Sequence, residues 1–128
     1  MTGKKPKPNV ERLYECLTDG RYDEARRLLH PEYHSNTQPY ETSIDALIEE
    51  IEAIKQAMTS LKRETILTMA DGDMEVILQR VEGIDPSSGD TVAYRSADFF
   101  RKAADGRFIE HWDALTFDGG DLFDAIEL

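Results

Sequence analysis

Apolar residues recur at three- and four-residue steps in the first third of the chain, which is the spacing of amphipathic helices. A first helix is predicted from Asn9, a suitable N-cap, to Asp19, where a glycine follows and ends it. A second helix is predicted from Tyr22 to about Leu29. It stops at the next residue, because Pro31 disfavours helix in the residue before it.

The segment 32–42 has no clear periodicity and is predicted to be a loop or a short irregular strand. Ser43 then begins a third and longer helix, with acidic residues near its start. Its apolar stripe runs at helical spacing through Ile44, Leu47, Ile48, Ile51, Ile54 and Met58.

From about residue 62 onward the pattern changes to strands. Four are predicted, over residues 63–70, 74–83, 91–102 and 108–117, separated by turn residues rich in Asp, Gly, Pro and Ser. Three helices followed by four strands indicate an α+β domain in which a curved, cone-shaped antiparallel sheet wraps around the helices. We expect one domain over residues 9–117, a disordered basic arm over 1–8 and a C-terminal tail over 118–128.

The last two strands carry polar groups on a face that should be buried. Alternation along a strand places His111 and Asp113 on the same face. A two-residue loop at Asp105-Gly106 would set Asp98 opposite Asp113, and a four-residue loop would set Asp98 opposite His111. A three-residue loop with a bulge would move Asp98 away from both. The first two registers gather two carboxylates and an imidazole, which predicts a pocket.

Composition narrows the function classes. Acidic residues outnumber basic ones 26 to 15, for a net charge of −11, which argues against a nucleic-acid partner. The single cysteine, Cys16, excludes an internal disulfide and fits a reducing compartment. No run of about 20 apolar residues and no secretion signal is present, so a cytoplasmic protein without membrane contact is expected. No zinc-type spacing or phosphate-binding loop is visible, so we expect no metal and no cofactor.

The order of these features resembles the nuclear-transport-factor-2-like superfamily, and within it the SnoaL-like polyketide cyclases. The most specific part is Asp98-Phe99-Phe100-Arg101 followed by residues 105–113, which end in Glu-His-Trp-Asp. The resemblance implies a conical pocket and a cofactor-independent aldol cyclase or isomerase acting on a small or medium hydrophobic carbonyl compound. In that family the acid that matches Asp113 is the general acid/base.

The resemblance also suggests roles for other residues. Asp98 and His111 complete the expected catalytic group, with Asp98 raising the pKa of Asp113 as a neighbouring carboxylate. Related steroid isomerases use a tyrosine of the first helix as a donor to the oxyanion, which is approximately matched by Tyr14. Candidate substrate-binding residues are Tyr14, Tyr33, Asn36 and Phe100.

Two related activities are disfavoured. Steroid isomerases carry their base where this chain has only Ser35, Asn36 and Thr37, none of which removes a carbon-bound proton unaided. The related epoxide hydrolases need an arginine two residues before the strand aspartate, and here Ser96 stands in that place.

Other interpretations remain open. The protein could be a non-catalytic ligand-binding or interaction module, which a pocket filled by Phe100, Met69 and Leu78 would favour. Asp98 could form a structural ion pair with Arg80. On the opposite face, aromatic residues flanked by charges predict a homodimer through the outside of the sheet; these residues are Phe99, Trp112, Arg101 and Glu110.

Overall fold

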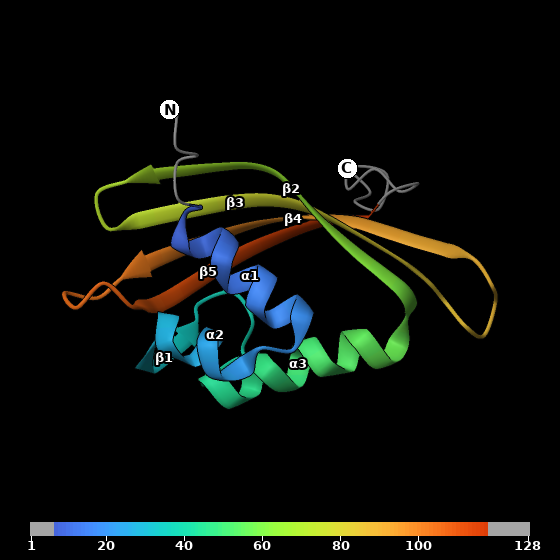
Figure 1. The fold of residues 1–128 in the computed structure, drawn as a ribbon, viewed down its shortest axis with the longest axis horizontal. Helices are drawn as coiled ribbons and strands as arrows, with labels where there is room; N and C mark the ends of the chain where they lie inside the picture. The colour runs from blue at the N-terminus through green and yellow to red at the C-terminus, as the bar shows by residue number, and fades with distance from the viewer. Residues whose placement is uncertain (1–6, 118–128) are drawn as a thin grey trace, which may run out of the picture.

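The structure is a computed structural model and describes residues 7–117; the predicted tail 118–128 and most of the predicted basic arm lie outside the described residues. Three helices pack under one face of a long curved sheet (Figure 1). The helices are α1 (Asn9–Asp19), α2 (Tyr22–Leu28) and α3 (Ile44–Ala57). The strands are β1 (Leu29–Ser35), β2 (Thr59–Asp71), β3 (Met74–Ile84), β4 (Thr91–Lys102) and β5 (Phe108–Phe117).

The sheet has the order β1-β5-β4-β3-β2 and is mixed. The predicted antiparallel sheet is correct for β2 to β5, but β1 pairs with β5 in parallel. The sequence pattern left residues 32–42 as a loop or a short irregular strand, and β1 is a strand that begins earlier, at Leu29; its pairing with β5 is interrupted between Leu29 and His34, so neither its start nor its parallel partner was predicted. Pro31 is compatible with this strand because β1 lies at the sheet edge.

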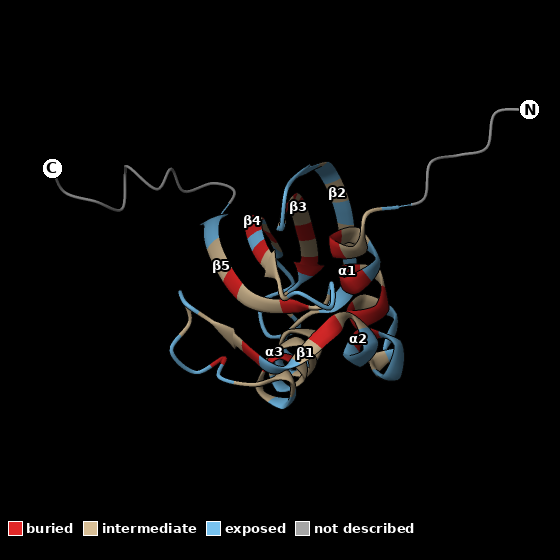
Figure 2. Ribbon diagram, turned by 90° about the vertical axis from the view of Figure 1, so that its left-hand side faces the viewer, coloured by how far each residue is buried: buried red, intermediate tan, exposed pale blue. Residues whose placement is uncertain are grey.

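The hydrophobic core lies between the helices and the concave face of the sheet. It joins the apolar stripe of α1 to Leu29 and Tyr33 of β1 and to Phe100 and Phe108 of the last two strands. Buried and less buried residues alternate along β3 and β4, as expected for strands with one face against the helices (Figure 2). Within the described residues, no helix is long and apolar enough to span a membrane.

Two helix starts show how the helices are fixed. Ser43 caps α3 as predicted, since its side chain accepts a hydrogen bond from the Ala46 N–H at 3.1 Å. Asn9 does not cap α1, because it is already the first helical residue and its side chain accepts from Arg12. Instead, the buried Glu75 carboxylate of β3 accepts from the Val10 N–H at 3.1 Å, which ties α1 to the sheet.

The register of the β4–β5 hairpin determines which of its residues lie opposite one another. Asp98 pairs with Asp113, and Phe100 pairs with His111, which is the register predicted for a two-residue loop. A bulge follows between Arg101 and Lys102, and it lies nearer the turn than the polar cluster. The two carboxylates and the imidazole therefore share the concave face.

Candidate functional site

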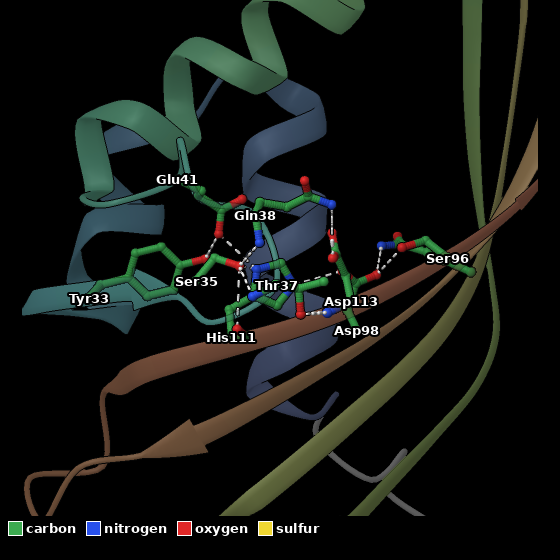
Figure 3. A network of polar contacts seen from close by, with 10 residues as sticks. Tyr33, Ser35, Thr37, Gln38, Glu41, Ser96, Asp98, His111 and Asp113 are labelled. Carbon is green, nitrogen blue, oxygen red and sulfur yellow. Dashed lines mark hydrogen bonds and ion pairs between the residues drawn. The ribbon is translucent and has the colours of Figure 1, made fainter.

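A buried ionic row crosses the concave face, with His111 at its centre (Figure 3). The His111 Nε2 lies 2.8 Å from Asp98 Oδ1, and its Nδ1 lies 2.8 Å from Glu41 Oε2. All three residues are at most 2% exposed. Because carboxylates only accept hydrogen bonds, this geometry fits an imidazolium that donates from both nitrogens.

The surrounding rings and hydroxyls hold this imidazole in place. Phe100 stacks on it, with ring centroids 4.3 Å apart and an interplanar angle of 8°. The Tyr33 hydroxyl donates to Glu41 Oε2 at 2.5 Å and lies 3.1 Å from His111 Nδ1. Ring orientation and protonation are therefore both fixed by neighbours.

The carboxylates set the charge of His111. Burial acts to lower the pKa of His111, but the hydrogen bonds and charges of Asp98 and Glu41 outweigh it and raise the pKa to about 9. For Glu41, burial acts to raise the pKa, but the hydrogen bonds from His111, Glu50 and Tyr33 and the charge of His111 together outweigh it, so the pKa lies below its ordinary value. At neutral pH the row therefore contains an imidazolium and cannot offer His111 as a free base.

Asp98 is anchored by two further donors. Its Oδ2 accepts from Gln79 Nε2 at 3.0 Å and from the Ser96 hydroxyl at 2.6 Å. The ion pair with Arg80 that the sequence left open does not form, because Arg80 lies on the opposite face of β3, next to Gln79 in sequence. Ser96 takes up the position where an epoxide hydrolase would need its arginine.

A cavity of about 260 Å³ opens beside this row, between α1, α3 and the concave face of the sheet. Most of its wall is apolar, formed by residues that include Leu17, Leu47, Ile51, Ile54, Leu61, Val81 and Leu115. Its carboxyl, imidazole and phenol groups belong to Tyr14, Glu41, Glu50, Tyr94, Asp98, His111 and Asp113. Phe100, Met69 and Leu78 do not line or fill it, and Met69 is 67% exposed on the outside of the sheet.

Asp113 reaches the cavity as a half-buried carboxylate. Gln38 Nε2 donates to its two oxygens at 3.1 and 3.4 Å, and Thr37 Oγ1 accepts from its backbone N–H at 3.0 Å. Burial raises the pKa of Asp113, and the opposing effects of the Gln38 hydrogen bond and the His111 charge are smaller. A raised pKa makes this carboxylate a stronger base than a solvated aspartate.

Glu50 of α3 faces the same cavity and was not predicted. Its Oε2 atom is buried and has no hydrogen-bond partner among the described residues. Burial, followed by the hydrogen bond and charge of Glu41, raises the pKa of Glu50 to about 8. Glu50 is therefore mostly a neutral acid at pH 7.

The predicted substrate-binding residues occupy three different positions. Tyr14 lines the cavity, and burial followed by the charge of Asp98 raises its pKa well above the ordinary value, so the hydroxyl keeps its proton. Tyr33 and Phe100 are buried behind the row and support His111. Asn36 is exposed and does not line the cavity, because its amide donates to Glu110, which alternates with His111 and points to the other face.

Sequence reasoning missed Glu41, Glu50, Gln38 and Gln79. Glu50 had a visible signal, since it is an acid three residues after Leu47 on the helix face that packs inward. Glu41 had none, because it lies in an aperiodic connection that only the parallel pairing of β1 brings beside His111.

Asp98, His111 and Asp113 also offer three potential metal-ligand atoms within 4.8 Å of one another. A metal ion would have to displace the proton on His111 Nε2, which Asp98 stabilises.

Comparison with known proteins agrees with this architecture. The model of the SnoaL-like domain matches residues 10–111. TsrD from Streptomyces laurentii superposes with a TM-score of 0.72 at 23% identity, covering 88% of this chain and 91% of TsrD. A SnoaL-like polyketide cyclase from Agrobacterium tumefaciens gives 0.70 at 12% identity, covering 84% of this chain and 87% of the cyclase. IdmH from Streptomyces antibioticus superposes with a TM-score of 0.71 at 17% identity, covering 83% of this chain and 88% of IdmH.

At these identities the solved structures establish the fold and leave the activity open. No curated protein matches the chain in sequence. The family match ends at His111, so Asp113 lies two residues beyond it on the same strand. Because the match spans most of the chain and the fold agrees, the protein belongs to the SnoaL-like domain family of the nuclear-transport-factor-2-like superfamily.

Proposed function

We propose that this protein is a cofactor-independent acid/base enzyme, of aldol cyclase or isomerase type, that acts on a small or medium hydrophobic carbonyl compound. The observation that carries the proposal is the position of Asp113. Its carboxylate faces a largely apolar cavity and is basic for an aspartate, whereas both His111 nitrogens are already engaged.

In the proposed reaction Asp113 removes a proton from the carbon next to the substrate carbonyl. Negative charge then develops on the carbonyl oxygen and needs a hydrogen-bond donor in a dry site. The Tyr14 hydroxyl lies on the cavity wall, keeps its proton and hydrogen-bonds to Asp98, and it serves this oxygen by exchanging that partner for the substrate. Asp98 and His111 act as positioning residues, and the Asp98 charge also adds to the basicity of Asp113.

The neighbours support the reaction class, since the Agrobacterium tumefaciens protein is a polyketide cyclase with the same fold. A cavity of about 260 Å³ is at the lower end of ordinary ligand pockets, which favours a compact substrate of a few rings or fewer.

The proposal can be tested without the natural substrate. A bicyclic ketone such as 2-tetralone has an apolar body and activated C–H bonds next to its carbonyl. In deuterium oxide the wild-type protein should accelerate exchange of these hydrogens, as measured by NMR. Asp113→Asn keeps the shape of the side chain but removes the base, so exchange should fall by roughly 10²- to 10⁴-fold.

Asp71→Asn is the matched control, because it removes the same charge from an exposed position at the far end of β2. It should leave exchange unchanged. If the wild-type protein binds the ketone but does not accelerate exchange, or if Asp113→Asn exchanges as fast as the wild type, the enzymatic proposal fails. The first outcome would favour a non-catalytic ligand-binding module.

We also propose that the outer face of the sheet forms a homodimer. Two rows of apolar residues cross four neighbouring strands there, with Leu67, Met69 and Phe99 between 40% and 67% exposed. The rows are Met69, Val76, Phe99 and Trp112, and Leu67, Leu78, Ala97 and Ala114. Contiguous exposed apolar surface of this kind marks an interface, and a second copy related by a two-fold axis presents the same rows.

A further inference from the structure

The proposed base has an unexplained neighbour in the cavity. Glu50 projects from α3 toward the same space that Asp113 reaches from β5. Its buried Oε2 has no partner among the described residues, although buried polar atoms are almost always hydrogen-bonded. The carboxyl group of Glu50 also hydrogen-bonds to Glu41, so the unpaired Oε2 is the atom left to bind a ligand in the cavity.

We propose that Glu50 is the catalytic acid that works with Asp113, donating its proton to the carbonyl oxygen of the substrate. This inference rests on the proposed function and adds to it the residue that neutralises the developing charge. It also specifies that the substrate oxygen lies toward α3 and the reacting carbon toward β5.

The surroundings keep Glu50 in the form that this role requires. Glu41 is held as a carboxylate by His111 and Tyr33, so a second charge beside it is disfavoured and Glu50 stays protonated. The ionic row thereby gives the two acids of the cavity, Asp113 and Glu50, different protonation states. It leaves Asp113 as the base and Glu50 as the acid, and such a pair of carboxyl groups in different protonation states suits acid/base catalysis.

Every proton and electron pair in the proposed step has a donor and an acceptor. The C–H bond next to the carbonyl breaks, its proton goes to Asp113, and its electron pair forms the C=C bond of an enol whose oxygen takes the proton of Glu50. In the exchange reaction, the proton on Asp113 is first replaced by deuterium from the solvent, and both transfers then reverse. In a cyclisation, the enol carbon forms a bond to a second carbonyl carbon, whose oxygen takes the proton from Asp113, and the enol O–H returns its proton to Glu50.

The pH dependence of this step involves every ionisable group around Glu50. These groups are Tyr33, Tyr40, Glu41, Tyr94, His111 and Asp113, with Lys55 and Arg63 on the cavity wall. Among them, Asp113 must be ionised and Glu50 protonated for turnover. The exchange rate should therefore rise as Asp113 ionises and fall above a pH of about 8, where Glu50 loses its proton.

The test is the exchange of 2-tetralone hydrogens by Glu50→Gln across this pH range. Glutamine keeps the shape and a hydrogen-bond donor but cannot transfer a proton, so we expect a rate at pH 7 at least roughly 10²-fold lower and no alkaline fall. Glu49→Gln is the matched control, since Glu49 is the exposed neighbour on α3 and loses the same charge. It should keep both the rate and the alkaline fall. Circular dichroism and thermal melts check that both variants fold.

Failure of this inference can be separated from failure of the proposed function. If Glu50→Gln keeps the wild-type rate and alkaline fall while Asp113→Asn abolishes exchange, the role of Glu50 is overturned and the enzymatic proposal stands. If the wild type does not exchange, the affinity for the ketone decides. The donor role is supported if the affinity of the wild type for the ketone falls above a pH of about 8 and that of Glu50→Gln does not. It is overturned if the affinity of the wild type does not change with pH. A carboxyl NMR titration that finds Glu50 ionised at pH 7 overturns the inference without any probe.

Discussion

The two faces of the β4–β5 hairpin use neighbouring residues for opposite purposes. Toward the helices, Asp98 and His111 belong to the buried ionic row, and the half-buried Asp113 lies beside it at the cavity. Toward solvent, Phe99 and Trp112 form part of an exposed apolar surface. The usual rule of apolar inside and polar outside is therefore reversed at these positions. The reversal is the observation behind both proposals, a ligand on the concave face and a second copy of the chain on the convex face.

The largest effect on stability is expected from removing His111 from the ionic row. His111→Phe keeps a ring against Phe100 but leaves the Asp98 and Glu41 carboxylates buried without their cation. Removing one partner of a buried ion pair typically destabilises by roughly 3–5 kcal/mol. Denaturant unfolding at pH 7 should show a loss of this size. Trp112→Phe, one residue along and on the convex face, should cost less than about 1 kcal/mol; equal losses in the two variants would contradict the contrast between the faces.

A second large effect concerns pH, and it belongs to the concave face alone. Folding raises the pKa of His111 from 6.5 to about 9, so the folded state binds more protons between these values. The stability from this group is complete below pH 6.5 and is lost as the pH rises through about 9, a change of roughly 3 kcal/mol. Glu50 acts in the same direction, because its pKa is raised from 4.5 to about 8.

The free energy of unfolding should therefore decline between pH 6.5 and about 9.5 in the wild type. The decline should be shallower in His111→Phe, which lacks the titrating imidazole, and unchanged in Trp112→Phe. A wild-type stability that is constant over this range would show that His111 is not charged in the folded protein.

A substitution on the convex face should have a moderate effect on dimer affinity and a small effect on the exchange rate at the cavity. Phe99→Glu places a carboxylate in the centre of the proposed dimer surface, which should raise the dimer Kd at least ~30-fold, as loss of an interface hot spot does. Sedimentation velocity over a concentration series measures this. The ketone exchange rate per chain should stay within about twofold, because the side chain points away from the cavity. A wild-type protein that is monomeric at every concentration would refute the dimer.

The smallest effect is expected at the rim of the convex face. Arg101 and Glu110 form an ion pair there, with the arginine side chain 40% exposed. Exposed ion pairs typically contribute less than about 1 kcal/mol, and salt screens them. Arg101→Gln should therefore change the free energy of unfolding by less than this, and less still at 1 M salt. A loss like that of His111→Phe would mean that the rim is as important as the concave row.

Much of the fold was predictable from local patterns. The apolar stripes of α1 and α3 and the alternation in β3 to β5 gave three helices and an antiparallel sheet, because a side chain's direction in a regular element depends only on its position. The same alternation brought Asp98, His111 and Asp113 to one face. It left the region of β1 as a loop or a short irregular strand, because β1 pairs through a few interrupted contacts at the edge of the sheet.

The candidate site was predictable only in part, because its membership depends on where separate elements come together. Of the candidate substrate-binding residues, Tyr14 lines the cavity, whereas Asn36 lies outside it and its amide donates to Glu110 on the other face. Glu41 and Glu50 come from segments distant in sequence, and no spacing rule links them to His111.

The sequence by itself determined the helices, the four antiparallel strands and which residues of the last hairpin face the helices. It did so because periodicity encodes which side of an element is buried. Only the tertiary structure decided the protonation states. Charge at a buried group depends on the carboxylates and hydroxyls that pack around it from β1, α3 and the sheet. These contacts raise the pKa of His111 to about 9, of Glu50 to about 8 and of Asp113 above its ordinary value, and the roles that we propose for them rest on these shifts.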